Sequence, residues 1–129
     1  LSGKNVTVIG RSVLVGKSLA LLLTKEDATV TLCHSRTKNL KFITKHSDIV
    51  VCAVGKAQFL KADMIKKNTI VVDVGMNRNE SGKVCGDCSF EDVSKIASFI
   101  TPVPGGIGPM TITMLLKNLL KAYNSIQKQ

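Results

Sequence analysis

The order of segments along the chain predicts an α/β fold: a single domain with a doubly wound, mainly parallel sheet and helices on both faces. Three observations support this prediction. Short segments rich in β-branched residues alternate with segments of helical periodicity along the whole chain. Several strand-like segments are apolar on both faces, which is typical of a parallel sheet that helices cover on each side. The 129 residues are about half of what a TIM barrel needs, so an open sheet remains.

Five segments carry the strand signal. Residues 5–9 and 28–33 are rich in Val and Thr. Residues 48–54 and 69–74 are almost wholly apolar, as buried central strands are, and residues 98–101 form a shorter run of the same kind. Because helical segments separate these runs, the strands are expected to pair in parallel.

Helical segments complete the pattern, which is Rossmann-like. Leucine and alanine dominate residues 17–24, and weaker helical patterns cover residues 39–46, 60–65 and 90–97. The longest helix is expected from residue 110 to about residue 128. Its apolar residues recur at three- and four-residue intervals and form one wide stripe, which consists of Ile112, Leu115, Leu116, Leu119, Leu120 and Tyr123. We expect most of this stripe to pack on the sheet.

Composition and charge limit the classes of function. Hydrophobic residues make up 44% and charged residues 21% of the chain, which excludes a largely disordered protein. Eighteen Lys and Arg against nine Asp and Glu give a net charge of +9, which favours anionic partners such as phosphates. The lysines are spread along the chain, however, and one Tyr, four Phe and no Trp supply little for base stacking. Nucleic acid is therefore not favoured as a partner.

The sequence shows no signal for a membrane or a secretory pathway. Its apolar runs, such as residues 19–23, are far short of the ~18 residues that span a bilayer, so no membrane partner is expected. Without a signal-peptide pattern the expected location is cytoplasmic, and a mitochondrial one stays open for a parent with a transit peptide. The four cysteines are accordingly expected to be reduced. Since the chain opens with Leu1 directly before a strand, we expect a piece of a longer protein.

One cysteine pair, Cys85 and Cys88, has the spacing of half a zinc site or of a redox motif. Zinc needs four ligands, and the other cysteines and histidines offer no second pair at ligand spacing. A thioredoxin-like pair would stand at a helix start after the first strand, which this pair does not. We therefore expect structural cysteines and no bound metal.

The turn after the first predicted strand suits a phosphate group. Gly10 at the strand end permits a tight turn, and Gly16 at the helix start lets backbone amides approach a phosphate. Arg11 and Ser12 follow Gly10, and the helix N-terminus adds partial positive charge. Ser12 replaces the middle glycine of the G-x-G-x-x-G pattern, and the last interval is one residue longer. A tight turn without a ligand therefore stays open.

The end of the second strand favours NADP over NAD. An NAD-binding domain has an Asp or Glu here that accepts hydrogen bonds from the adenosine ribose, but this chain has His34, Ser35 and Arg36. A hydroxyl and a guanidinium suit a 2′-phosphate instead, and Arg11 from the first turn can reach the same group. The alternative is that Ser35 and Arg36 are solvated loop residues.

Glycines also mark the later strand ends. Val54 with Gly55, and Gly75 farther on, place backbone free of side chains at the ligand edge of the sheet. Residues 101–111 are the most unusual segment, because prolines stiffen it and glycines expose its amides before the last helix begins. Its candidate contact residues are Pro104, Gly105, Gly106, Gly108, Pro109 and Thr111. Such a rigid loop places backbone groups against a flat ligand.

These motifs together closely resemble one enzyme family, the bifunctional methylenetetrahydrofolate dehydrogenase/methenyltetrahydrofolate cyclohydrolases of the FolD type. The resemblance covers essentially the whole chain, matches the family's carboxy-terminal cofactor-binding domain, and is most specific in residues 101–111. The chain departs from the family at Ser18 and Ala57, where proline is usual, and in residues 85–90, which replace a Gly-Asp-Val-Asp-Phe pattern.

The resemblance implies a role for the first two turns. Gly10, Arg11 and Ser12 match the family's dinucleotide turn. Arg11 and Ser35 match positions that receive the 2′-phosphate in NADP-using members. Because the family's proton chemistry lies elsewhere, His34 is expected to position or contact the cofactor.

The resemblance also implies roles for the later strand ends and names a catalytic motif that this chain lacks. Val54-Gly55 and Gly75 match backbone that lines the cofactor, and residues 104–111 match the loop beside the nicotinamide and the folate site. The family's catalytic Tyr-x-x-x-Lys motif belongs to a separate amino-terminal domain. The only tyrosine here, Tyr123, has no lysine four residues later, so no catalytic residue is expected in this chain.

The implied function is the NADP-binding half of a one-carbon enzyme. The parent would oxidise methylenetetrahydrofolate to methenyltetrahydrofolate, with hydride transfer to NADP, and hydrolyse the product to formyltetrahydrofolate. Its partners would be the folate substrate, the amino-terminal domain and, in the intact enzyme, a second copy. Because hydride transfer needs both halves, we expect this chain alone to bind NADP with little or no turnover. The alternative is a non-enzymatic nucleotide-binding module with a basic partner-binding surface.

The resemblance further implies a second contact for the last helix. In the family this helix returns towards the amino-terminal domain, so part of its apolar stripe is expected to be exposed here. Such exposure would make the chain prone to self-association.

Overall fold

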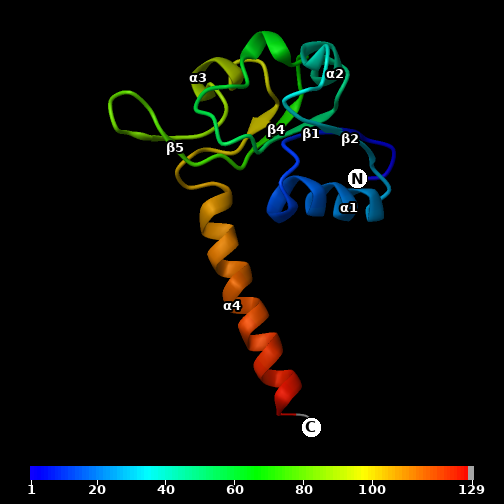
Figure 1. Ribbon diagram of the computed structural model, residues 1–129, viewed down its shortest axis with the longest axis vertical. Helices are drawn as coiled ribbons and strands as arrows, with labels where there is room; N and C mark the ends of the chain where they lie inside the picture. The colour runs from blue at the N-terminus through cyan, green and yellow to red at the C-terminus, as the bar shows by residue number, and fades with distance from the viewer. Residues whose placement is uncertain (128–129) are drawn as a thin grey trace.

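The computed structural model describes residues 1–127 and confirms the predicted α/β fold (Figure 1). Five parallel strands form one sheet in the order β2-β1-β3-β4-β7. The strands are β1 (Asn5–Ile9), β2 (Thr29–Cys33), β3 (Ile49–Cys52), β4 (Ile70–Asp73) and β7 (Phe99–Ile100). Each strand lies inside a segment predicted as a strand, because apolar runs between turns leave little freedom in where a buried strand can form.

One face of the sheet is covered by α1 (Ser18–Lys25). Val6 and Val8 point to this face from β1, and Leu19 and Leu23 of the helix pack against them. The alternation along β1 follows from the pleat, which sends successive side chains to opposite faces.

The other face is covered by three shorter elements: α2 (Leu40–Lys45), the 3-10 turn η2 (Ala62–Met64) and α3 (Phe90–Val93). Figure 1 shows α2 and α3 on the opposite side of the sheet from α1, so the doubly wound arrangement is confirmed. The core on this face includes Ile9 and Val50 from the central strands. Helix α3 ends at Val93, earlier than the predicted segment 90–97, which continues as a turn.

A hairpin that the sequence reading missed follows β4. Its strands, β5 (Asn77–Arg78) and β6 (Val84–Cys85), are antiparallel and form a separate two-stranded sheet. Asn79 closes its loop: the side-chain oxygen accepts a hydrogen bond from the Lys83 amide at 2.9 Å. Strands of two residues have no room for a periodic pattern, which is why periodicity does not reveal them.

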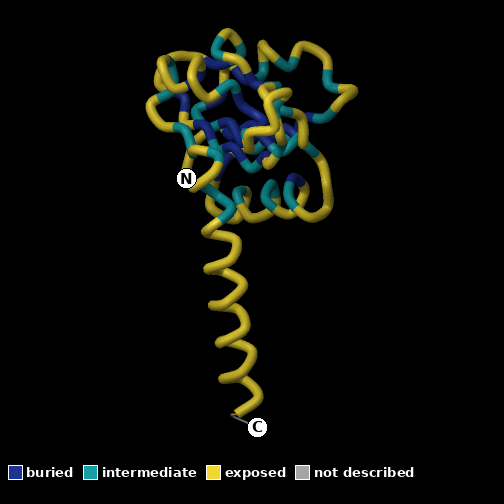
Figure 2. The backbone as a smooth tube through the Cα atoms, turned by 90° about the vertical axis from the view of Figure 1, so that its left-hand side faces the viewer, coloured by how far each residue is buried: buried dark blue, intermediate teal, exposed yellow. Residues whose placement is uncertain are grey.

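The last helix, α4 (Ile107–Ile126), corrects a prediction. It begins at Ile107 rather than at residue 110, and the predicted end at Lys128 lies outside the described residues. Instead of packing on the sheet, α4 extends away from the rest of the domain (Figures 1 and 2). Its apolar stripe is 57–67% exposed at Ile112, Leu115, Leu116, Leu119, Leu120 and Tyr123.

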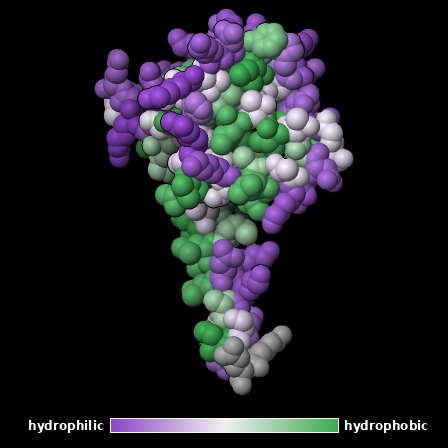
Figure 3. Space-filling view, turned by 45° about the vertical axis from the view of Figure 1, so that its right-hand side comes forward, coloured by the Kyte–Doolittle hydropathy of each residue, from purple (hydrophilic) through white to green (hydrophobic). Residues whose placement is uncertain are grey.

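The expectation that most of this stripe packs on the sheet is therefore wrong. Periodicity shows that a helix has an apolar face, but it does not identify the surface that covers this face. In Figure 3 the apolar side of α4 continues downward from apolar surface on the body of the domain. Within residues 1–127, no helix is long and apolar enough to cross a membrane.

Candidate cofactor and substrate-loop site

The register of the sheet brings the predicted turns to one edge. Ile9 lies opposite both Cys33 and Cys52, and Cys52 lies opposite Asp73, so four strands end level with one another. The ladder continues one residue farther: Gly10 donates its amide to the Cys33 carbonyl at 2.9 Å. The turns after β1, β2, β3 and β4 consequently lie next to one another in sheet order, at the carboxyl edge where open α/β sheets bind ligands.

Close approach explains both glycines of the first turn. Gly10 has a φ of +120°, and a Cβ on it would lie 2.1 Å from the Ala53 carbonyl oxygen. A Cβ on Gly16 would lie 1.9 Å from the Gly10 carbonyl oxygen, and Gly16 is buried. The space that Gly16 leaves open is thus filled by the chain's own backbone. Gly16 therefore permits close packing of helix and strand, and the prediction that it lets backbone amides approach a phosphate is corrected.

The first turn is one residue longer than in the G-x-G-x-x-G pattern, and a π-helical turn, η1 (Val13–Lys17), accommodates the additional residue. This turn leads directly into α1. Ser12 caps this turn, since its hydroxyl accepts a hydrogen bond from the Val15 amide at 3.2 Å. A π-helical turn holds one residue more than an α-helical turn, so the spacing that departs from G-x-G-x-x-G still delivers a helix start beside the strand end. Arg11 is exposed at this edge.

The second turn has a fixed shape. The His34 amide donates to the Thr37 hydroxyl at 2.8 Å, and the Thr37 amide donates back to the His34 carbonyl at 2.8 Å. The His34 Nδ1 atom accepts a hydrogen bond from the Arg36 amide at 3.2 Å, which leaves Nε2 as the donor in a neutral ring. Ser35 and Arg36 are exposed. Among residues 1–127, neither the Arg11 nor the Arg36 guanidinium forms an ion pair, so both are available to an anion.

The third turn, after β3, is held in place by hydrogen bonds to the Asp87 side chain. This fully buried carboxylate accepts hydrogen bonds from the amides of Val54, Gly55 and Lys56. The sequence reading missed Asp87 and its neighbour Asp73. One signal for them was in the sequence: Asp73 stands at the end of an apolar strand, where a buried charge needs fixed hydrogen-bond partners, and a Gly86-Asp87 pair follows it.

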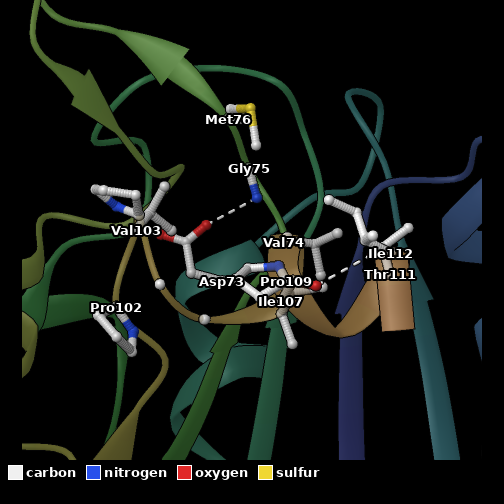
Figure 4. Close-up of a pocket in the computed structure, with 14 residues that line it drawn as sticks. Asp73, Val74, Gly75, Met76, Pro102, Val103, Ile107, Pro109, Thr111 and Ile112 are labelled. Carbon is white, nitrogen blue, oxygen red and sulfur yellow. Dashed lines mark hydrogen bonds between the residues drawn. The ribbon is translucent and has the colours of Figure 1, made fainter. Parts of the chain in front are cut away.

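The fourth turn and the proline–glycine loop enclose a cavity of about 680 Å³ (Figure 4). Val74 and Met76 form one side, and Val103, Ile107 and Ile112 line the loop and helix side, so the walls are largely apolar. The Thr101 hydroxyl ties this loop to β4, because it accepts a hydrogen bond from the Asp73 amide at 2.7 Å.

Two glycines shape this loop. Gly105 has a φ of +100°, and a Cβ on Gly106 would lie 2.4 Å from the Pro102 carbonyl oxygen. The Val103–Pro104 peptide is cis. Helix α4 starts directly after Gly106, and within its first turns the Thr111 hydroxyl donates to the Ile107 carbonyl at 3.1 Å.

The predicted site residues fall into two adjoining groups. The residues that line the cavity are Gly75, Pro104, Gly105, Gly106, Gly108, Pro109 and Thr111. The remaining ones, which lie along the edge outside this cavity, are Gly10, Arg11, Ser12, Gly16, His34, Ser35, Arg36, Val54 and Gly55. Since neighbouring strands lie ~4.8 Å apart, the edge from β2 to β4 spans about 14 Å, a suitable width for an extended ligand.

The residues suit an anion at one end of this edge and a flat, weakly polar group at the other. Two guanidinium groups and the first helix start lie toward β1 and β2, whereas the apolar cavity lies at β4 and β7. Within residues 1–127, no group of three or more His, Cys, Asp and Glu side chains is arranged to hold a metal ion. The expected absence of a metal stays a prediction.

Comparison with curated proteins gives relatives of one kind. The chain is 63% identical over 122 residues to the bifunctional protein FolD of Bacillus velezensis, covering 95% of this chain and 43% of that protein. It is 60% identical over 129 residues to the bifunctional protein FolD of Campylobacter hominis, covering 100% of this chain and 45% of that protein. The chain thus spans less than half the length of these relatives.

Solved structures show the same fold. The bifunctional FolD enzyme of Campylobacter jejuni superposes with a TM-score of 0.94 at 50% identity, over 96% of this chain and 44% of that one. The Trypanosoma brucei methylenetetrahydrofolate dehydrogenase-cyclohydrolase, solved with NADP cofactor and inhibitor, gives a TM-score of 0.91 at 41% identity. That match covers 99% of this chain and 46% of the other.

The family comparison covers the sheet, the four turns and the proline–glycine loop together. The model of the tetrahydrofolate dehydrogenase/cyclohydrolase NAD(P)-binding domain matches residues 1–127. The chain therefore belongs to the tetrahydrofolate dehydrogenase/cyclohydrolase family, as its NAD(P)-binding domain.

Proposed function

We propose that this chain is the NADP-binding half of an enzyme that oxidises methylenetetrahydrofolate and hydrolyses the methenyltetrahydrofolate formed. The observation that carries the proposal is the single sheet edge on which the family's cofactor motifs lie level with one another, from His34 after β2 to Gly75 after β4. Family membership over residues 1–127 and a relative solved with NADP support the choice of cofactor.

The order of the turns supports one direction for the bound cofactor. Ser35, Arg36 and Arg11 would take the 2′-phosphate, because a hydroxyl and two guanidinium groups without an ion-pair partner among residues 1–127 lie exposed there. Gly10 and Ser12, at the helix entry, would take the pyrophosphate. The nicotinamide would then lie past Val54-Gly55, toward Gly75 and the apolar cavity.

The residues of this chain orient the reactants and exclude water. NADP⁺ supplies the hydride acceptor when bound. The backbone of Pro104, Gly105 and Gly106 and the side chains of Val74 and Met76 provide an apolar wall against which a flat ring and the folate can be held at reacting distance. Among residues 1–127, Asp73 is the only titratable side chain that lines this cavity, and its oxygens already accept backbone hydrogen bonds. Proton transfer is consequently assigned to the rest of the enzyme.

We further propose that the exposed stripe of α4 packs against the remaining part of the parent protein, including an amino-terminal domain with the catalytic lysine. The stripe is a long apolar face without cover among the described residues, and the relatives are more than twice as long as this chain. A homodimer of the intact enzyme, folate as its substrate and a cytoplasmic location belong to the same proposal.

Titration calorimetry of the purified chain with NADP⁺ and NAD⁺ tests the cofactor assignment. We expect saturable binding that favours NADP⁺ and little or no turnover of methylenetetrahydrofolate. Arg11→Ala removes one charged contact to the 2′-phosphate, so the Kd for NADP⁺ should rise about tenfold while that for NAD⁺ changes little. Lys25→Ala, at the far end of α1, is the matched control and should leave both affinities unchanged.

Two results would contradict the proposal. Failure of the chain to bind either dinucleotide would refute the cofactor site as described. Turnover by the chain alone would show that a catalytic group lies within it. Binding of NADP⁺ combined with a parent protein that lacks both folate activities would favour the alternative, a non-enzymatic nucleotide-binding module.

A further inference from the structure

Asp87 makes an unusual set of contacts beneath the cofactor edge. Its Oδ2 atom accepts hydrogen bonds from the amides of Val54 at 2.6 Å and Gly55 at 2.9 Å. Its Oδ1 atom accepts from the Lys56 amide at 2.9 Å and from the Asn77 side chain at 2.8 Å. One side chain thereby joins the turn after β3 to the first residue of the hairpin after β4.

A second buried carboxylate holds Asp87 itself in place. Asp73 accepts hydrogen bonds from the amides of Gly75, Asp87 and Cys88, all at 2.8–2.9 Å. The two carboxylates pack directly against glycine backbone. A Cβ on Gly75 would lie 2.3 Å from the Asp87 Cγ atom, and one on Gly86 would lie 2.0 Å from the Asp73 Oδ2 atom. These two glycines are therefore needed for the carboxylates to approach the backbone.

Stability alone does not account for this arrangement. Gly55 and Lys56 are exposed residues, and a surface turn can donate its amides to water when they face outward. Here the amides face inward and donate to Asp87 instead. Burying a carboxylate at 0% exposure is costly, and a turn with outward-facing amides would avoid this cost. What the carboxylate adds is a fixed geometry for three consecutive residues at the centre of the ligand edge.

The carboxylate also changes what the turn offers a ligand. Three consecutive amides that point the same way form an anion-binding nest. Asp87 fills this nest from the protein side, so the amides of Val54, Gly55 and Lys56 are not available to a phosphate. This arrangement favours phosphate binding on the Gly10–Ser12 side of the edge and the uncharged half of the ligand at the β3 and β4 turns.

We propose that Asp87 is a positioning residue for the cofactor, which holds residues 54–56 in the shape that receives the dinucleotide and keeps phosphate away from them. This inference rests on the proposed function for the identity of the ligand. The holding of the turn itself can be measured without any ligand.

The first experiment compares the full chain with Asp87→Asn. An amide has only one acceptor atom, so two of the four donors at this position would face an NH₂ group. We expect the Kd for NADP⁺ to rise about tenfold. Hydrogen exchange of the Val54, Gly55 and Lys56 amides should accelerate about tenfold or more, while the amides of β1 keep their protection.

The matched control is Val6→Ala, which leaves a cavity on the α1 face at the start of β1, away from the edge. Both variants are measured at a temperature where circular dichroism shows each to be folded. Val6→Ala should lower Tm without changing the Kd for NADP⁺. If Asp87→Asn does not fold, Asn77→Ala removes a single donor from the carboxylate and should accelerate exchange in residues 54–56 by a smaller factor.

Unchanged exchange in residues 54–56, or an equal rise in Kd for Asp87→Asn and Val6→Ala, would overturn the inference. If the unmodified chain does not bind NADP⁺, the proposed function fails. The exchange measurement still decides in that case, because selective loss of protection in residues 54–56 supports the holding of the turn and its absence refutes it.

Discussion

At the residue scale, close backbone contacts do much of the work at the ligand edge. Gly10 lets the first turn approach the Ala53 carbonyl after β3, and Gly16 lets the helix entry approach the end of β1. Gly75 and Gly86 let two carboxylates approach the backbone. The need for glycine at Gly10 was predictable, since a strand-to-helix turn commonly requires one. The need at Gly86 was not, because it depends on Asp73, which is 13 residues earlier in the chain and adjacent only after folding.

The thiols give a test at the same scale. A hydrogen bond with the Cys52 thiol, burial and the nearby Asp73 carboxylate all raise the pKa of the Cys88 thiol above its ordinary value. Burial likewise raises the pKa of Cys33. Because only a thiolate reacts readily and Cys85 is the one cysteine that is not buried, Ellman's reagent at pH 8 should label Cys85 alone. All four cysteines should react in guanidinium chloride.

Cys85→Ser is the control, and it should remove the rapid labelling. Rapid reaction of two or more thiols in the folded chain would contradict the buried placement.

The raised pKa values of Cys33 and Cys88 also predict a pH dependence of stability. The native state holds the protons of these two thiols more tightly than the unfolded chain does. The resulting stability is present below the ordinary thiol pKa of 9.0 and is lost as the pH rises above it.

At the element scale, the strands followed from the sequence and the last helix followed only in part. The apolar runs of β3 and β4 locate these strands within one or two residues, because a strand buried on both faces consists mainly of apolar residues. The amphipathic pattern of α4 is equally clear. Its surroundings were not predictable, because an apolar stripe is consistent with any apolar surface that covers it.

The exposed stripe predicts self-association of this chain at high concentration. Replacing Leu116 and Leu119 together by Lys should abolish association, as measured by light scattering or sedimentation. Because both side chains are more than 60% exposed, the free energy of unfolding should change by less than about 0.5 kcal/mol per site. Asn118→Lys, which adds charge without removing stripe surface, is the control. A clean monomer of the unmodified chain at millimolar concentration would count against this prediction.

At the scale of the whole molecule, the sheet order decides the site. Turns that are 20 or more residues apart in sequence become neighbours because β1 lies between β2 and β3 and β4 follows β3. The sequence reading placed each turn at a strand end and so predicted a common edge. The sequence also predicted an anion at the first two turns and a flat ligand at the proline–glycine loop, but it did not reveal the apolar cavity between this loop and β4.

Cofactor binding to this edge should stabilise the whole domain. A ligand at 100 times its Kd adds about 2.7 kcal/mol to the free energy of unfolding, which corresponds to a rise in Tm of about 10 °C for a chain of this size. Scanning calorimetry with NADP⁺ should show such a rise, and NAD⁺ at equal concentration a smaller one. Arg11→Ala should reduce the NADP⁺ shift and leave the Tm without ligand unchanged. Equal shifts with the two dinucleotides would contradict the assignment of Ser35 and Arg36 to a 2′-phosphate.

The sequence by itself determined the fold class, the five strands and the turns that carry the cofactor motifs. These features depend on local patterns of apolar residues and on glycine and proline, which act over a few residues. Only the tertiary structure decided the Asp73–Asp87 pair, the two-residue strands of the hairpin and the exposure of α4. Each of these depends on which distant segments meet in space, and the energy of such contacts is set by packing and burial rather than by local propensity.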